Sequence, residues 1–354
     1  MGRSETPKRL YNTFVKLRLD RLTDRQLLDL RLCDLPLRIQ GTQLEQRIEK
    51  LYRELEARSL SFRPHFWLAE EWFTPDGVAG FAIPFYLAHP RLIKLERAQM
   101  IEVEGASESE CMRILRHEAG HAIDNAYRLH ARRSWADTFG SYRVPYPEWY
   151  QPQPDSKDYV LNLDAWYGQA HPAEDFAETF AVWLKPGMRW RRQYEGWGAE
   201  RKLDYVDYLM KDLSERSVAR HTKASRRHVD ALPTLKTTLR EHYRRKRAYY
   251  TIHWPSSYER NLFRVFSAEP RHHLFPSAAQ FLRHIRRDVC DVVARGTGVH
   301  HYTINHIMRH MIVRCRELNL RLTMKKEEAR QLLIVMLTMQ VMQVLRTGYH
   351  RIPL

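Results

Sequence analysis

The sequence has few cysteines and lacks any pairing pattern among them. Its four cysteines in 354 residues, Cys33, Cys111, Cys290 and Cys315, show no Cys-x-x-Cys spacing. They therefore indicate neither a disulfide framework nor a thiolate metal site. Unpaired, scattered thiols are typical of a reducing compartment, so the expected location is the cytoplasm.

Long apolar runs are also missing. The most apolar stretch, residues 332–345, has 14 residues and is flanked by Arg330 and Arg346. Because a bilayer requires about 20 apolar residues, this stretch is expected to be a core helix. The first ten residues lack the apolar segment of a signal peptide. We therefore expect no membrane partner.

Acidic residues are scarce in the C-terminal part of the chain. Residues 220–354 contain 26 Lys and Arg but only 9 Asp and Glu. Residues 1–219 contain 32 Lys and Arg and 33 Asp and Glu. Such asymmetry predicts a domain boundary near Arg220 and an acidic partner for the second domain, nucleic acid being one class.

One motif stands out from this background: His117-Glu118-Ala119-Gly120-His121, inside a predicted helix from about Glu108 to Ala131. Ser107 followed by Glu110 predicts the capping box that starts this helix. Side chains four residues apart share a helix face, so the two histidines can hold one metal ion. This spacing predicts one Zn²⁺ per chain, with Glu118 taking a proton from a zinc-bound water.

A second predicted helix, residues 171–184, offers the third ligand. Pro172 lies in its first turn, where a missing N–H is harmless, and Glu174 and Glu178 share a face with aromatic residues. We expect Glu174 to be the third ligand and Glu178, with Asp124, to support the ligating histidines by hydrogen bonds. The alternative is an acidic first turn that merely complements the helix dipole.

These two helices together carry a resemblance to a known group. An H-E-x-x-H helix followed by a glutamate from a later helix resembles the gluzincins, and residues 117–127 with 174–178 are similar to its lethal-factor-like clan. The block 171–181 also resembles the bacterial zinc-binding metallopeptidases, and a looser likeness runs from Gln40 to Leu213. The resemblance implies a zinc-facing tyrosine, here Tyr167, that would stabilise an oxyanion. A packed aromatic residue is the alternative for Tyr167.

The expected fold is α+β, mostly α. The pattern predicts a helix over 44–60 and strands over 36–39, 66–73, 78–87, 92–95 and 100–103 before the metal-binding helix. The resemblance implies a zincin-like metallopeptidase domain over residues 1–219, with a sheet edge that pairs with an extended peptide. Pro84 marks either that edge or the end of its strand. Residues 139–159, rich in Tyr, Pro and Trp, form either a substrate-facing loop or a packed flap.

Residues 220–354 are expected to form an all-α basic domain, with helices over 235–250, 277–294, 302–318 and 325–345. Arg244 to Arg247 beside Tyr249 and Tyr250 suit contacts with phosphates and bases, although a solvated helix end has the same composition. No nearby carboxylate completes a metal site with His306 and His310, so these are expected to be polar-face or packing residues, with a second metal site as the alternative.

Two functions follow. The first is a zinc-dependent peptidase or amidase, in which Glu118 is the general base and Tyr167 or His171 binds the oxyanion. Its substrate is a peptide or protein, and acidic peptides are one option that the sequence allows. The second is a nucleic-acid or acidic-polymer binding protein whose basic C-terminal domain is the working part, with or without the recruitment of a protease.

Overall fold

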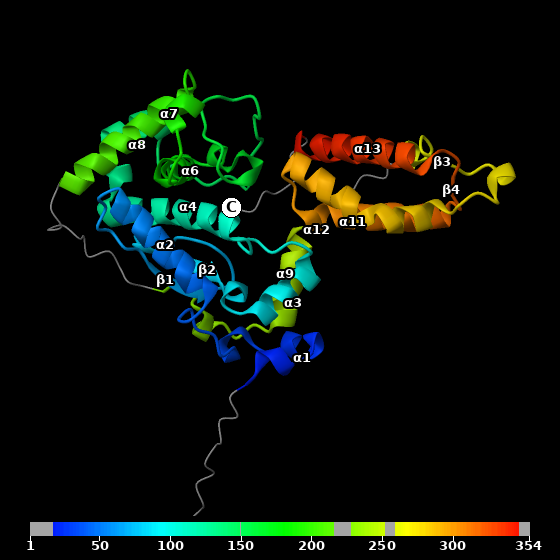
Figure 1. The fold of residues 1–354 in the computed structure, drawn as a ribbon, viewed down its shortest axis with the longest axis horizontal. Coiled ribbons are helices and arrows are strands. Elements are labelled where there is room, and N and C mark those ends of the chain that lie inside the picture. The colour runs from blue at the N-terminus through cyan, green and yellow to red at the C-terminus, as the bar shows by residue number, and fades with distance from the viewer. Residues whose placement is uncertain (1–16, 149, 216–227, 252–258, 347–354) are drawn as a thin grey trace, which may run out of the picture.

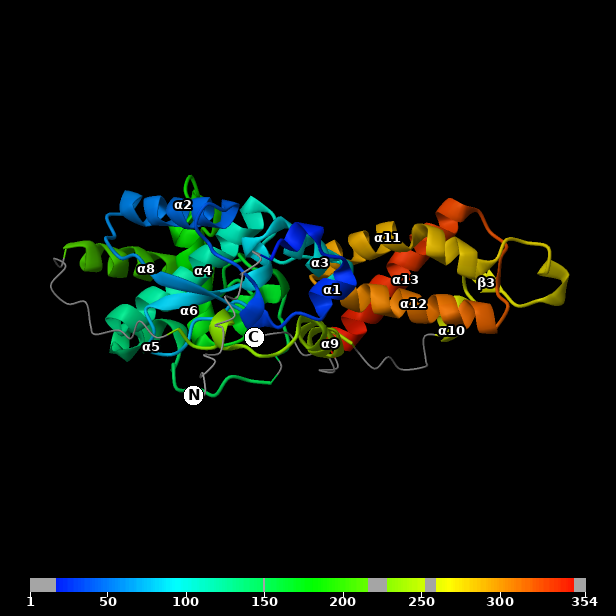
Figure 2. The same cartoon turned by 90° about the horizontal axis from the view of Figure 1, so that it is seen from below.

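The computed structural model describes residues 17–148, 150–215, 228–251 and 259–346. It is mostly helical, with two short two-stranded pairings, and so confirms the α+β, mostly α class. The described residues form two bodies along the long axis of the molecule, as Figures 1 and 2 show. We call residues 17–251 the N-terminal body and residues 259–346 the C-terminal body, because each has its own hydrophobic core.

The N-terminal body begins with short helices and a small sheet. Its elements are α1 (Asp24–Leu28), α2 (Gln43–Ala57), β1 (His65–Ala69), β2 (Gly80–Pro84) and α3 (Pro90–Met100). The strands β1 and β2 are parallel, with His65 opposite Gly80. Every residue of β2 is buried, as expected for an apolar strand covered on both faces. Pro84 is the last residue of β2.

Three predicted strands are wrong. Residues 36–39 form no strand, residues 92–95 lie inside α3, and residues 100–103 continue from its end. Pro90 occupies the first turn of α3 and the His89 side chain caps it, so a helix starts here. The short apolar pattern at Leu92 and Leu95 is compatible with a strand or a helix, and the cap at His89 favours the helix.

The metal-binding motif lies on α4 (Glu108–Tyr127), which begins after Ser107 as predicted and ends earlier, at the left-handed Arg128. After α5 (Arg133–Phe139), α6 (Pro172–Leu184) occupies the predicted second helix. Figure 1 shows α4 beside α6, with α2 on one side and α7 (Trp190–Gln193) and α8 (Gly198–Glu215) on the other.

The helices α4 and α6 approach closely at a glycine. A Cβ atom at Gly120 would lie 2.9 Å from the Cα of Ala177 and 3.2 Å from its carbonyl oxygen. Only glycine fits this contact without displacing α6. The contact between Gly120 and Ala177 therefore brings the histidines of α4 close to the glutamates of α6.

The division of the chain differs from the predicted boundary at 219/220, which falls in a stretch outside the described residues. Leu239 and Tyr243 of α9 (Leu239–Tyr249) are fully buried in the N-terminal core. Lys246 of α9 forms ion pairs with Glu71 and Glu96. The helix α9 thus belongs to the N-terminal body. Its charges have partners there, which the composition of the chain does not reveal.

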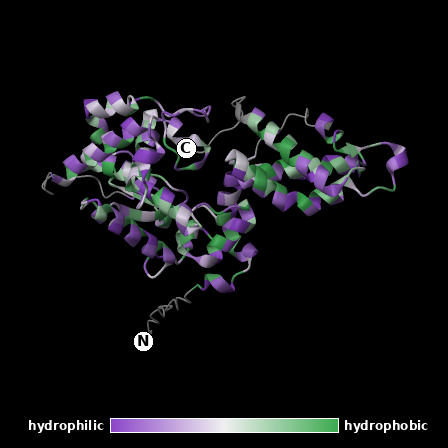
Figure 3. Cartoon of the chain, turned by 45° about the horizontal axis from the view of Figure 1, so that its top comes forward, coloured by the Kyte–Doolittle hydropathy of each residue, from purple (hydrophilic) through white to green (hydrophobic). Residues whose placement is uncertain are grey.

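The C-terminal body is a bundle of three long helices. It contains α10 (Glu259–Leu262), α11 (Ala278–Thr297), α12 (His301–Glu317) and α13 (Lys326–Arg346), with a two-residue antiparallel pairing of β3 (Phe266–Ser267) and β4 (Arg321–Leu322). Figure 3 shows apolar residues gathered where these helices face one another. The predicted helices are therefore present, with a small β ladder added. Among the described helices, none combines the length and apolar character needed to cross a bilayer.

Candidate metal centre

His117, His121 and Glu174 converge on one point between α4 and α6. The Nε2 atoms of the two histidines are 3.1 Å apart, and Glu174 Oε2 lies 3.1 Å from the first and 3.2 Å from the second. His117 and Glu174 are buried, and His121 is largely so. Among the described residues this is the one group of three or more potential ligand residues close enough to hold a metal ion.

The dimensions of this triangle suit a small tetrahedral ion. Zn²⁺ binds histidine nitrogen and carboxylate oxygen at about 2.0–2.1 Å, which places neighbouring ligand atoms of a tetrahedron about 3.3 Å apart. The observed edges of 3.1–3.2 Å are slightly shorter. Two nitrogens and one oxygen are also the donors of catalytic zinc sites, which leave a fourth position open. The residues therefore fit the predicted ion.

Glu178 fixes the tautomer of His117. The Nδ1 atom of His117 lies 2.8 Å from Glu178 Oε1, and Asn162 Nδ2 and the Leu163 N–H each donate to the same carboxylate at 2.7 Å. When the Glu178 carboxylate accepts the His117 Nδ1 proton, Nε2 offers a lone pair to the centre. The expected supporting role of Glu178 agrees with this geometry.

Glu118 lies beside the ligands and has a hydrogen-bond donor of its own. The Thr74 hydroxyl donates to Glu118 Oε2 at 2.8 Å. Burial raises the pKa of the Glu118 carboxyl, while His117 and His121 lower it. A carboxylate with a raised pKa is a stronger base than an exposed one, which suits a residue that takes up a proton.

Tyr167 also faces this site. Its ring centroid is 5.6 Å from that of His117, and burial together with the Glu174 and Glu118 carboxylates raises the pKa of Tyr167 well above its usual value. The phenol therefore keeps its proton at neutral pH. Ala165 and Trp166, just before it, both have left-handed backbone angles, an uncommon conformation that clusters at functional sites.

His171, by contrast, has no free nitrogen. Its Nδ1 accepts the Ala173 N–H at 3.1 Å as the cap of α6, and its Nε2 donates to the Val144 carbonyl at 2.7 Å. The expectation that His171 can bind an oxyanion is therefore wrong, because both atoms are used to start a helix and to anchor a loop.

Asp124 also differs from expectation. Its carboxylate accepts the backbone N–H and the Nδ1–H of His130, both at 2.7 Å. It thus secures the end of α4 and contacts neither metal-binding histidine.

Tyr146 is a contact that sequence reasoning missed. Its hydroxyl donates to Glu174 Oε1 at 2.9 Å, and its ring stacks on His171 at 3.8 Å between centroids. Tyr146 lies in the aromatic loop 139–159, so this loop packs on the metal centre. The high aromatic content of this loop was the only feature of the sequence that could have indicated the contact.

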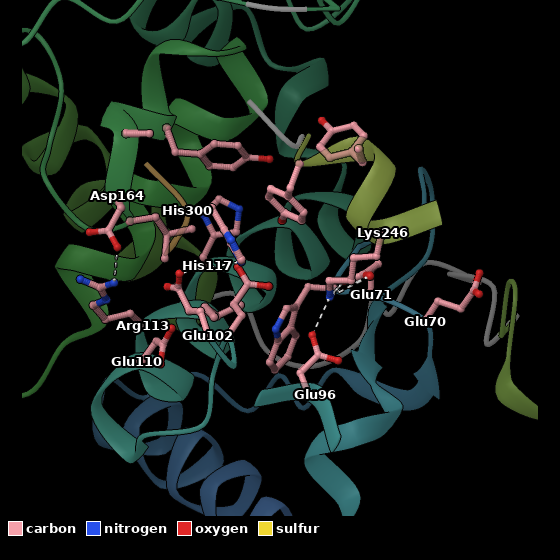
Figure 4. A pocket seen from close by; sticks show the side chains of 18 of the residues that line it. Glu70, Glu71, Glu96, Glu102, Glu110, Arg113, His117, Asp164, Lys246 and His300 are labelled. Carbon is pink, nitrogen blue, oxygen red and sulfur yellow. Dashed lines mark hydrogen bonds and ion pairs between the residues drawn. The ribbon is translucent and has the colours of Figure 1, made fainter. Parts of the chain in front are cut away.

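A cavity of about 560 Å³ opens beside the centre, lined by His117, Glu118 and Tyr167 on one side and by α9 and His300 on the other. Figure 4 shows the carboxylates around it, among them Glu70, Glu71, Glu96, Glu102 and Glu110. The His300 ring stacks on Tyr250 at 4.1 Å between centroids, so the C-terminal body contributes to the wall.

The basic run of α9 faces this wall. Arg245 pairs with Glu70 at 2.7 Å, Lys246 is nearly buried between carboxylates, and Arg247 donates to Gln99. Tyr250 packs under His300. Three of the four cations expected to meet phosphates are therefore engaged within the protein.

Comparison with known proteins adds no relative. No family model, no curated protein and no solved structure matches this chain.

Proposed function

We propose that this protein is a zinc-dependent hydrolase that cleaves a peptide or amide bond. The observation that carries the proposal is the triangle of His117 Nε2, His121 Nε2 and Glu174 Oε2, with the Glu118 carboxylate beside it on the same cavity. Structural zinc sites are closed by four protein ligands, whereas three ligands next to a cavity are typical of catalysis.

When bound, Zn²⁺ would supply a Lewis acid that polarises the scissile carbonyl and lowers the pKa of water. Glu118, which Thr74 holds in place, would accept a proton from the attacking water and pass it to the leaving nitrogen. Tyr167, protonated at neutral pH, would donate a hydrogen bond to the oxygen that becomes negative. Glu178 would keep His117 in the ligating tautomer.

The test combines metal content with hydrolysis of a mixed peptide library. We expect about one zinc per chain in the natural protein and in Glu118→Gln, and loss of zinc in His117→Ala and Glu174→Ala. Glu118→Gln should lower kcat by roughly 10²–10⁴-fold, the usual contribution of a general base. The control is Glu108→Gln, which removes an exposed carboxylate from the same helix and should leave the rate unchanged. Hydrolysis that survives in Glu118→Gln would overturn the assignment.

The alternative function, binding of nucleic acid through the basic part, is less favoured. Two cations of α9, Arg245 and Lys246, pair with Glu70, Glu71 and Glu96. The cavity beside them is lined by more carboxylates than cations, which repels phosphates.

A further inference from the structure

We propose that the outer face of α13 is the contact surface of an antiparallel dimer with a second copy of this chain. Figure 1 shows α13 along one edge of the C-terminal body, where it packs on α11. One side of the helix is buried in the core of that body, through Ala329, Leu333, Leu337 and Val341. The opposite side of α13 faces away from this core.

This opposite side is apolar although it is exposed. Leu332, Val335 and Met339 are 43%, 57% and 67% exposed, and Met342 is partly exposed. We call these four residues the outer strip. Residues 331–345 include no Asp, Glu, Lys or Arg. The solvent-facing side of a surface helix is normally polar or charged, and a continuous apolar strip that remains exposed indicates an interaction surface.

The spacing of the outer strip suits packing against a second helix. Its residues follow one another at intervals of three, four and three positions. This is the average of about 3.5 residues with which the contacts between two long helices repeat along their common axis. The strip therefore matches a helical partner that repeats with the same period.

Opposite charges stand at the two ends of the outer strip. The same spacing continues to Glu328, four residues before Leu332, and to Arg346, four residues after Met342. Glu328 is exposed and, among the described residues, takes part in no ion pair. The strip thus begins with an acid and ends with a base.

A two-fold axis level with residue 337 gives every position of the strip a suitable partner on the other copy. The pairs between the copies are Leu332 with Met342, Val335 with Met339, and Glu328 with Arg346. Symmetry makes each of these contacts twice. A parallel pair would instead place like charges opposite one another at both ends, which is unfavourable. The strip is therefore complementary to itself in the antiparallel direction, which an unrelated partner would not require.

A membrane surface fits the outer strip less well. Helices that lie on anionic lipid carry Lys and Arg beside their apolar face. The polar residues beside this strip are the uncharged Gln331, Thr338 and Gln343. Uncharged flanks also avoid repulsion at the contact between two copies of a chain whose net charge is +16.

Sedimentation of the full chain over a range of concentrations tests the proposal. We expect a dimer that dissociates at micromolar concentrations, because a single helix pair lies at the small end of specific interfaces. Val335→Glu should weaken dimerisation about tenfold or more, since a carboxylate would be buried there without a partner. The matched control is Leu274→Glu. Leu274 is 85% exposed but lies outside α13, so its replacement should leave the dimer unchanged.

Exchange of the end charges tests the direction of the pair. Glu328→Arg should weaken dimerisation about threefold, because it places two cations together at each end of the contact. Adding Arg346→Glu should restore the natural affinity, since opposite charges then meet again. Circular dichroism and zinc content should be unchanged in every variant, because these positions lie away from the metal centre.

The outcomes that contradict the proposal are distinct. A chain that stays monomeric well above micromolar concentrations, or a dimer that Val335→Glu leaves intact, would rule out the outer strip as the contact. A loss in Glu328→Arg that Arg346→Glu does not reverse would rule out the antiparallel arrangement. Equal losses in Val335→Glu and Leu274→Glu would show that the effect does not depend on α13.

Discussion

Single hydrogen bonds set the position of each group at the metal centre. Tyr146 holds the Glu174 oxygen that does not face the histidines, at 2.9 Å. We therefore expect Tyr146→Phe to weaken zinc binding by roughly 10–100-fold, the usual cost of losing a hydrogen bond to a metal ligand. Competition with a coloured chelator measures this.

Tyr142→Phe is the control at the same scale. Tyr142 lies in the same loop, but its hydroxyl donates to Asp76 and its ring stacks on His130. Its loss should leave zinc affinity within about twofold of the natural value, because a hydrogen bond that does not reach a ligand does not orient one. Equal losses in both variants would mean that the whole loop, rather than the Glu174 contact, supports the site.

Between elements, the distance from α4 to α6 decides whether three ligands can meet. The Gly120–Ala177 contact leaves no room for a methyl group. Gly120→Ala should therefore destabilise the fold by about 1–3 kcal/mol, the usual cost of overpacking, and also weaken zinc binding. Urea unfolding and chelator competition on the same protein measure both.

Gly296→Ala provides the comparison for this helix contact. Gly296 lies inside α11, and an added Cβ would have no neighbour within 4 Å. This change should stabilise the protein by roughly 0.5–1 kcal/mol, since alanine favours a helix over glycine. A Gly120→Ala protein as stable as the natural one, with full zinc affinity, would contradict the role given to close packing.

For the whole molecule, α9 is an integral part of the body that holds the metal centre. A chain that ends at residue 219 lacks Leu239 and Tyr243, which are fully buried, and removes Lys246 from buried Glu96. The apolar surface that α9 covers would then be exposed to water. We expect residues 1–219 to be unfolded and residues 1–251 to fold and bind zinc, measured by circular dichroism and metal content. A folded, zinc-binding chain of residues 1–219 would restore the predicted boundary.

Local regularities explain the predictions that hold. The spacing of His117 and His121 and the Ser107 and Pro172 helix starts depend on residues within a turn or two of one another, so the pattern shows them directly. The prediction of a strand at 92–95 also rested on a local pattern. It fails because a short apolar run has no unique period, and the His89–Pro90 cap favours a helix.

By itself, the sequence determined where the ligands lie on their helices and predicted which of them would meet, because residue spacing within a helix is local. Tertiary structure alone decided how the ligands are supported and what surrounds them. Tyr146 is 28 residues from Glu174, Thr74 is 44 from Glu118, and Lys246 is 175 from Glu71. Pairing across such distances engages Arg245 and Lys246 of α9 with carboxylates, because charges act on neighbours in space, whereas composition counts them along the chain.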